Sequence, residues 1–315
     1  MNAHEARLVV VGTDGRPGSD GALRYGVAEA LRRHAPLRIV HVVQLPAVVT
    51  AYPPIGPAAP APVTEPGAEG ESVLRRAIEV VRRLAPELEV STELKHGGRV
   101  RCLVEAAQRA ELLVVGRETR RGLDRMLGGA TTAAVASRAE CDVVVVPSFW
   151  TEEHAHGEVV AAVKSRGHAP ELLRRAFAEA SARRAALTVV TAWAVADPYL
   201  DRIELRTHAA DWRADGEAML GELLADWRTV YPDVPVETLV AHGSAADVIL
   251  AASQESDLVL ISRRRLSVPP SGHLGGVAHA VLRRSDVPVA VVPFEGPEDQ
   301  LTPELVLEQS GQPLK

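Results

Sequence analysis

Residues 111–147 read ELLVVGRETRRGLDRMLGGATTAAVASRAECDVVVVP, and this stretch decides the fold class. An apolar run is followed by a loop rich in arginine and glycine, a short helical segment and a second apolar run. A strand, a glycine-containing loop and a helix N-terminus form an anion-binding layout, because glycine permits close backbone approach and the first N–H groups of a helix attract phosphate. The same layout is also an ordinary connection in α/β sheets, so both interpretations stay open.

The rest of the first half alternates apolar runs with segments of helical periodicity. Continuous apolar runs are typical of strands buried on both faces, and the helices between them then act as crossovers of a parallel sheet. Strands are expected at residues 7–14, 37–43, 88–94, 112–115 and 143–146. The segment 46–67 is rich in Pro and Ala and is expected to form a long surface loop.

Helical spacing predicts the buried faces of the crossovers. The first helix is expected to be capped by Ser19 and to bury one face, formed by Leu23, Val27, Ala30 and Leu31. In the second half, a longer helical region over residues 206–231 replaces the Pro-rich segment. Its expected buried face is formed by Trp212, Met219, Leu223 and Trp227.

The second half of the chain repeats the order of the first. His96 corresponds to His242, Gly129 to Gly275 and Pro147 to Pro293, all at an offset of 146 residues, while earlier positions correspond at an offset of 150. Its first, fourth and fifth strands are expected at residues 159–163, 258–261 and 287–292. We therefore predict two copies of one domain, over residues 1–150 and 151–296, followed by a tail over residues 297–315.

The composition excludes several classes of protein. Aromatic residues make up 3% of the chain, which argues against a stacking platform for nucleic acid. The formal net charge is −6, so no overall basic field attracts nucleic acid or an anionic membrane. Without a signal peptide or an apolar run near the roughly 20 residues of a membrane span, we expect a cytoplasmic location. Cys102 and Cys141 are far apart, which predicts neither a disulfide framework nor a metal site.

Both halves carry the stretches that point to a family. The first half contains VVVGTDGRPGSDGALRYGVAEA, APLRIVHVV and LLVVG…LGGATTAAVASRAECDVVVVP, and the second contains AALTVVTAW and DLVLIS…HLGGVAHAVLRRSDVPVAVVP. Over nearly its whole length the sequence resembles the universal stress protein family, as two domains in tandem. The resemblance implies two α/β, Rossmann-like domains, each with a five-stranded parallel sheet of strand order 3-2-1-4-5 and helices on both faces. It also implies antiparallel pairing of the two fifth strands, which here makes a pseudo-dimer within one chain.

The same resemblance implies a nucleotide site in the first domain. Nucleotide-binding members carry an Asp that ends the first strand and contacts the nucleoside, and backbone after the second strand that reads adenine. Around the phosphates they carry a Gly, two residues, a Gly, nine residues, a Gly and then Ser or Thr. The matching positions here are Asp14, Val42, Gly116, Thr119, Gly129 and Ala130.

Two of these positions depart from the family's pattern. Thr119 stands where the second Gly is expected, and Ala130 stands where Ser or Thr is expected. Thr131 and Thr132 follow and could supply a hydroxyl from shifted positions. The loop also offers four arginines that either reach phosphate oxygens or form a solvated basic loop: Arg117, Arg120, Arg121 and Arg125.

The second copy departs further from the pattern. Lys164 replaces the Asp, and Ser262 and Arg265 replace the first two glycines. Gly275 is kept, and Gly276 replaces the hydroxyl residue. No standard ATP site is expected there.

Three functions are weighed on this basis. The first is a stress-response or regulatory protein that binds ATP or another adenine nucleotide in the first domain only. The second is a dimerising interaction scaffold in which neither domain binds nucleotide. The third, an enzyme of a related nucleotide-binding fold, has no motif behind it, and we expect a protein that is not an enzyme. Association of two chains into a homodimer is left open.

Overall fold

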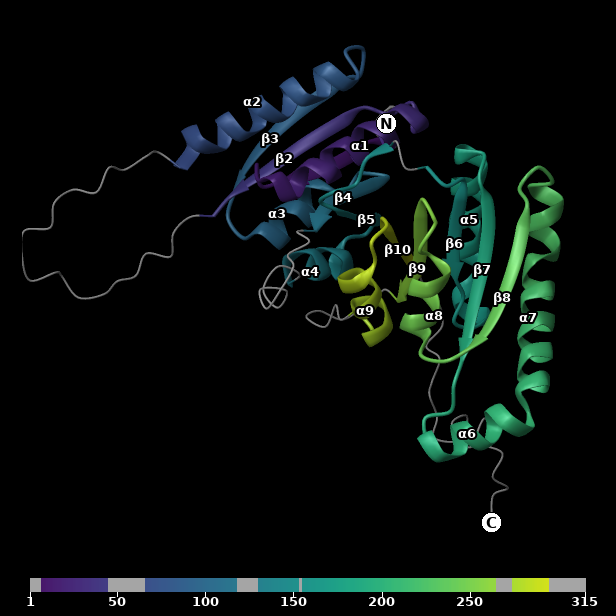
Figure 1. Ribbon diagram of the computed structural model, residues 1–315. Helices are drawn as coiled ribbons and strands as arrows, with labels where there is room; N and C mark the ends of the chain where they lie inside the picture. The colour runs from purple at the N-terminus through teal and green to yellow at the C-terminus, as the bar shows by residue number, and fades with distance from the viewer. Residues whose placement is uncertain (1–6, 45–65, 118–129, 153–154, 265–273, 295–315) are drawn as a thin grey trace, which may run out of the picture.

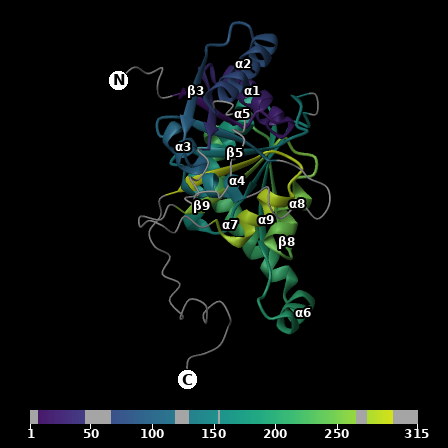
Figure 2. The same cartoon turned by 90° about the vertical axis from the view of Figure 1, so that its left-hand side faces the viewer.

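A computed structural model describes residues 7–44, 66–117, 130–152, 155–264 and 274–294. Within these residues the chain forms one ten-stranded sheet of order β3-β2-β1-β4-β5-β10-β9-β6-β7-β8. Strands β1 to β5 belong to the first repeat and β6 to β10 to the second. Figures 1 and 2 show the first repeat at one end of the molecule and α6 at the far end of the second.

The first repeat follows the predicted alternation of strands and helices. Its elements are β1 (Val9–Thr13), α1 (Asp20–Arg33), β2 (Leu37–Val43), α2 (Pro66–Leu84), β3 (Val90–His96), α3 (Arg99–Ala106), β4 (Leu112–Arg117), α4 (Ala130–Arg138) and β5 (Asp142–Pro147). All neighbouring strands within it pair in parallel. The strand order 3-2-1-4-5 is confirmed.

The second repeat has the same order, with one additional helix. Its elements are β6 (Glu158–Ala162), α5 (Ala169–Arg183), β7 (Ala186–Trp193), α6 (Pro198–Thr207), α7 (Ala209–Val230), β8 (Val236–His242), α8 (Ala245–Ala252), β9 (Leu258–Arg264), α9 (Gly276–Arg284) and β10 (Val289–Phe294). Its strands also pair in parallel.

Two hydrophobic cores cover the two faces of the sheet. Along β1, Val9 and Val11 point to one core and Val10 to the other, as the two-residue period of a strand requires. The first core lies under α1, α2, α5 and α7, and the second under α3, α4, α8 and α9. The continuous apolar strands of the sequence are therefore explained by helices on both faces.

The two repeats are joined edge to edge. Strand β5 pairs antiparallel with β10, with Val144 opposite Ala290 at the centre of the joint. This confirms the predicted pairing of the fifth strands within one chain. The pairing satisfies the backbone groups that a sheet edge would otherwise leave unpaired.

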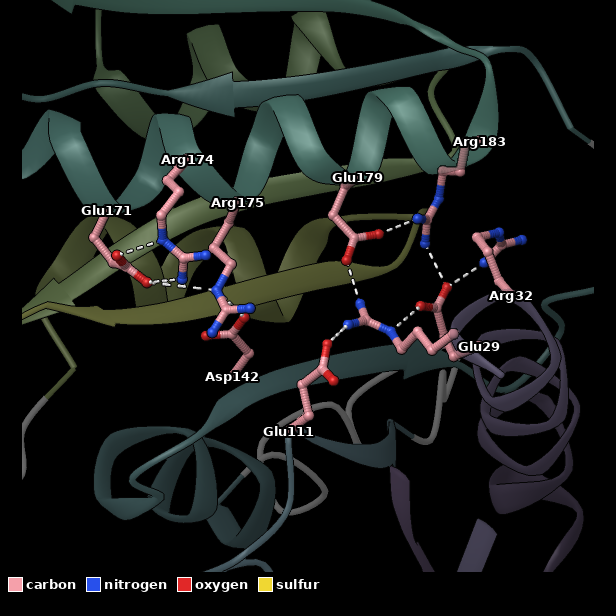
Figure 3. A network of polar contacts seen from close by, with 10 residues as sticks. Glu29, Arg32, Glu111, Asp142, Glu171, Arg174, Arg175, Glu179 and Arg183 are labelled. Carbon is pink, nitrogen blue, oxygen red and sulfur yellow. Dashed lines mark hydrogen bonds and ion pairs between the residues drawn. The ribbon is translucent and has the colours of Figure 1, made fainter. Parts of the chain in front are cut away.

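Side chains reinforce the joint in a reciprocal manner. Glu29 and Arg33 on α1 correspond to Glu179 and Arg183 on α5, and each arginine forms ion pairs with the glutamate of the other repeat (Figure 3). Glu29 is buried, with 1% of its side chain exposed. Burial alone would raise its pKa, but the charges of Arg183, Arg33 and Arg32 outweigh this and lower the pKa. The repeats therefore meet through a buried and charged contact of approximate two-fold symmetry.

Several local expectations were wrong or fall outside the described residues. Leu31 is 49% exposed, because Ala30 occupies the buried position of the last turn of α1. Ser19 makes no side-chain cap and instead donates to the carbonyl of Arg16 (2.9 Å). The helix α2 begins at Pro66, inside the segment expected to be a loop, while residues 45–65 and the tail lie outside the described part.

The long helical region of the second repeat also differs from the expectation. Helix α7 accounts for nearly all of it and α6 precedes it, and the fully buried residues of α7 are Leu220 and Leu224. Met219, Leu223 and Trp227 are partly buried against the same core. Trp212 is 36% exposed, because it lies near the start of α7 and stacks on Trp193 instead of entering the core. Among the described helices, none is long and apolar enough to cross a membrane.

Candidate functional site

A cavity of about 670 Å³ lies at the carboxyl ends of β1, β2 and β4. The chain leaves β1 toward β2 on one side and returns to β4 on the other, and ligands of open α/β sheets bind where the strand order reverses in this way. Five of the predicted site residues line this cavity: Asp14, Val42, Gly116, Thr131 and Thr132. Ala130 begins α4 and is exposed, and Thr119 and Gly129 lie outside the described residues.

The loop after β1 is held by its own hydrogen bonds. The Oδ1 atom of Asp14 accepts from the backbone N–H of Arg16 (3.0 Å), and Thr13 Oγ1 accepts from the N–H of Gly15 (3.2 Å). Gly15 has a φ of 73°, and a Cβ there would also lie 2.6 Å from Val73 Cγ2. The carboxylate of Asp14 is therefore fixed at the mouth of the cavity while its side chain stays exposed.

Gly116, at the end of β4, is required by packing. A Cβ at this position would lie 2.9 Å from the carbonyl oxygen of Gly18 and 3.2 Å from Ser19 Cα. Both are backbone atoms of the loop after β1, which cannot move aside as a flexible side chain could. Thr132 Oγ1 donates to the carbonyl of Gly116 (3.4 Å), which ties the first turn of α4 to the same strand end. The first N–H groups of α4 are thereby brought close to the cavity.

The hydrogen-bond pattern of β2 directs the backbone carbonyl of Val42 toward the cavity. The carbonyl of Pro36 accepts from Val9 of β1, and the carbonyl of Val43 accepts from Gly97 beyond β3. Because backbone groups alternate along a parallel strand, the carbonyl of Val42 points to the β1 side. Pairing with β1 ends at Thr13 opposite His41, so this carbonyl lies past the last paired residue. It is placed to accept a hydrogen bond from a ligand.

Three arginines from separate elements also line the cavity: Arg16, Arg76 and Arg99. All three are exposed, and no ion pair is found for any of their guanidinium groups within the described part of the chain. Arg76 and Arg99 were not predicted as site residues, since a lone arginine on an amphipathic helix is usually solvated. Comparing the two repeats could have singled them out, because the second repeat has Glu222 at the position of Arg76 and Ala245 at that of Arg99.

Arg117 does not serve the cavity. Its guanidinium is buried and donates to the carbonyl oxygens of Arg283 (2.6 Å) and Ser285 in the second repeat. Arg263, its counterpart, donates to the carbonyl of Ala139 in the first repeat. Neither alternative for Arg117, a phosphate ligand or part of a solvated basic loop, is correct, because its buried side chain contacts the second repeat at the joint. Arg120, Arg121 and Arg125 lie outside the described residues.

The corresponding region of the second repeat is arranged differently. Arg166, in the loop after β6, forms a salt bridge with Glu222 on α7 (2.5 Å). Trp193, at the end of β7, stacks on Trp212 with ring centroids 5.7 Å apart and contacts the ring of His242. His242 Nε2 also contacts Asp201 Oδ1 of α6 (2.9 Å). The first repeat has Val43 at the strand position of Trp193 and also has a histidine, His96, at that of His242, so the side chain at the end of β7 is the bulkier one.

Comparison with known proteins agrees with this architecture. The sequence profile described as "Universal stress protein family" matches residues 5–147 and again residues 157–293. Universal stress protein Rv2005c of Mycobacterium tuberculosis is 32% identical over 295 residues, which cover 90% of this chain and 96% of that protein. Universal stress protein Rv1996 of the same species is 27% identical over 321 residues, covering 96% of this chain and 100% of that protein.

Solved structures share the fold over both repeats. A universal stress protein from Archaeoglobus fulgidus superposes with a TM-score of 0.62 at 17% identity and covers 91% of this chain and 98% of its own. PA1789 from Pseudomonas aeruginosa, described as functionally unknown, gives a TM-score of 0.60 at 17% identity and covers 98% of this chain and 100% of its own. The chain therefore belongs to the universal stress protein family, with two copies of the family's domain in tandem.

Proposed function

We propose that this protein binds an adenine nucleotide, ATP in the first instance, in the cavity of the first repeat, and that the second repeat is its structural partner. The observation that carries the proposal is the convergence of Asp14, the Val42 carbonyl and the start of α4 on one cavity of about 670 Å³. Cavities of roughly 300–1,000 Å³ are typical of sites for ligands of this size. The salt bridge between Arg166 and Glu222 supports the absence of an equivalent site in the second repeat.

Each group suits a different part of a nucleotide. The carboxylate of Asp14 accepts hydrogen bonds from ribose hydroxyl groups, and the Val42 carbonyl accepts from the amino group of adenine. The N-terminus of α4, with Thr131 and Thr132, offers backbone and hydroxyl donors to phosphate oxygens. The protein then acts by binding and not by catalysis. His41, the histidine among the described cavity residues, places its Nδ1 2.8 Å from the carbonyl of Thr13, and among the described residues no hydrogen bond joins its ring to a hydroxyl group.

A second candidate function is a nucleotide-free interaction scaffold. It is favoured by the steric account of Gly15 and Gly116, because both glycines are required by contacts within the protein whether or not a ligand binds. The substitutions of the family's pattern at Thr119 and Ala130 favour it as well. On this account the joined repeats would present a rigid surface to a partner protein.

A thermal-shift titration with ATP separates the two functions. A ligand at about 100 times its Kd stabilises the folded state by roughly 2.7 kcal/mol. We expect ATP to raise the melting temperature of the wild type and of Lys164→Ala, whose substituted residue corresponds to Asp14 in the second repeat. Asp14→Ala should lose most of the shift, because the nucleoside contact is removed. If millimolar ATP gives no shift and the purified protein carries no nucleotide, the proposal is rejected in favour of the scaffold.

A further inference from the structure

Two of the three arginines that line the cavity of the first repeat, Arg16 and Arg76, have sequence counterparts that form a salt bridge in the second repeat. Arg16 is in the loop after β1, and Arg76 is almost three turns into α2. The Nε atom of Arg76 donates to the carbonyl of Ser72 on its own helix (3.4 Å), which leaves its terminal N–H groups for other partners. Asp14 and Glu69 also line the cavity, but the bond between Asp14 and Arg16 involves the backbone N–H and not the guanidinium.

The second repeat indicates how close the positions of Arg16 and Arg76 lie in the first. At the sequence offset of 150 residues Arg166 corresponds to Arg16, although Arg166 begins its 3-10 turn whereas Arg16 directly precedes the turn Pro17–Ser19. Glu222 corresponds to Arg76 at an offset of 146, and Arg166 and Glu222 form a salt bridge of 2.5 Å. The helices α2 and α7 are placed equivalently on their sheets. A Cβ on Gly70 of α2 would lie 2.6 Å from Leu94 of β3, and one on the corresponding Gly216 of α7 would lie 2.7 Å from Val240 of β8.

Side chains from these two positions are therefore able to meet across the end of the first strand of each repeat. The second repeat has opposite charges there, and the first repeat has two cations. Two like charges in this arrangement repel each other, whereas an anion between them makes charge-assisted hydrogen bonds with both. Guanidinium groups suit phosphate in particular, because their planar N–H donors match its oxygen atoms in pairs.

We infer that Arg16 and Arg76 form an anion clamp that binds phosphate groups of the nucleotide and favours ligands with two or more phosphates over those with one. The inference rests on the proposed function for the identity of the ligand. A chain of two or three phosphates brings several negative charges to the clamp, whereas adenosine brings none and a cyclic monophosphate brings one. The clamp thus makes the site selective for nucleoside di- and triphosphates.

Isothermal titration calorimetry at low ionic strength tests the clamp. ATP, cyclic AMP and adenosine are titrated into the wild type, Arg76→Glu and Arg75→Glu. Arg75 is an exposed residue of the same helix that does not line the cavity, so its variant has the same change of net charge. We expect Arg76→Glu to weaken ATP binding by about 10- to 100-fold, the range for losing a hydrogen bond to a charged group. Adenosine should change by less than about twofold, and Arg75→Glu should leave all three affinities near those of the wild type.

Two outcomes overturn the clamp. One is an equal loss of ATP and adenosine affinity in Arg76→Glu, which indicates a general disturbance of the site. The other is ATP binding that Arg76→Glu and Arg75→Glu affect to the same extent. A wild type that favours cyclic AMP over ATP refutes the selectivity.

A thermal-shift titration with inorganic tripolyphosphate tests the clamp independently of nucleotide binding. If the wild type binds neither ATP nor adenosine, the proposed function fails, and the clamp is judged on tripolyphosphate alone. A melting temperature that rises with tripolyphosphate in the wild type and in Arg75→Glu, but not in Arg76→Glu, supports the clamp. Equal responses of the three proteins reject it. Without any ligand, Arg76→Glu should melt at a higher temperature than Arg75→Glu at low salt, because it replaces a repulsive pair by an attractive one.

Discussion

Replacing Glu29 by glutamine is expected to weaken the joint between the two repeats. The Glu29 side chain is 1% exposed and forms ion pairs with Arg32, Arg33 and Arg183, of which Arg183 is 5% exposed (Figure 3). Removing one partner of a buried pair leaves an uncompensated charge and costs about 3–5 kcal/mol. Glu179 remains beside both Arg33 and Arg183, so we expect the lower end, about 3 kcal/mol.

Urea unfolding followed by circular dichroism measures this loss. Glu105→Gln is the control, because Glu105 forms an exposed pair with Arg101 within one helix and should leave the midpoint unchanged. The pH dependence gives a second readout. The folded-state pKa of Glu29 lies below its ordinary value of 4.5, so its contribution to stability is present above about pH 4.5 and is lost as the pH falls through the lowered pKa. An unchanged urea midpoint in Glu29→Gln at neutral pH would refute the reasoning.

Two further perturbations concern Asp142 and Gly116. Burial raises the pKa of Asp142 to about 6 despite the charge of Arg175. The contribution of Asp142 to stability is therefore full below pH 3.8 and falls as the pH rises through about 6. Asp142→Asn should remove this pH dependence of stability, measured as urea midpoints from pH 4 to 8. Gly116→Ala should cost about 1–3 kcal/mol through its clash with Gly18, whereas Gly221→Ala, in open space within α7, should stabilise by about 1 kcal/mol. Thermal melts of these two variants that shift in the same direction would contradict the steric account.

Much of the fold follows from patterns that are local in the sequence. Continuous apolar runs, their alternation with helical segments and the repeat offset together predict the strands, because burial on both faces leaves a signal in every strand. The pairing of β5 with β10 followed from the family resemblance and is confirmed by the register of Val144 with Ala290. The exact ends of elements were less well predicted, as β3 shows by starting at Val90.

The contacts of long side chains were not predictable in the same way. Arg117 lies in a loop-flanking position that suits a phosphate ligand, yet it reaches across the joint to the carbonyl of Ser285. Arg76 was not selected at all, since its role depends on the loop after β1, which lies 60 residues earlier in the chain. Such contacts depend on how distant elements pack, and a periodic pattern carries no information about them.

Part of the lining of the cavity was predicted from the sequence. The resemblance selected Asp14, Val42 and Gly116, and the structure places all three beside one cavity. The direction of the Val42 carbonyl became clear only from the hydrogen-bond alternation of β2. The steric need for glycine at position 116 could not be seen in the sequence, because it arises from the backbone of a different loop.

The stoichiometry of ATP binding tests the central claim most directly. Isothermal titration calorimetry of the full chain should give about one ATP per chain. Asp14→Ala should abolish this binding event, and Lys164→Ala should leave it intact, because Lys164 occupies the corresponding position of the second repeat. Two ATP molecules per chain, no binding, or a loss caused by Lys164→Ala alone would contradict an account in which the first repeat holds the nucleotide and the second supports it.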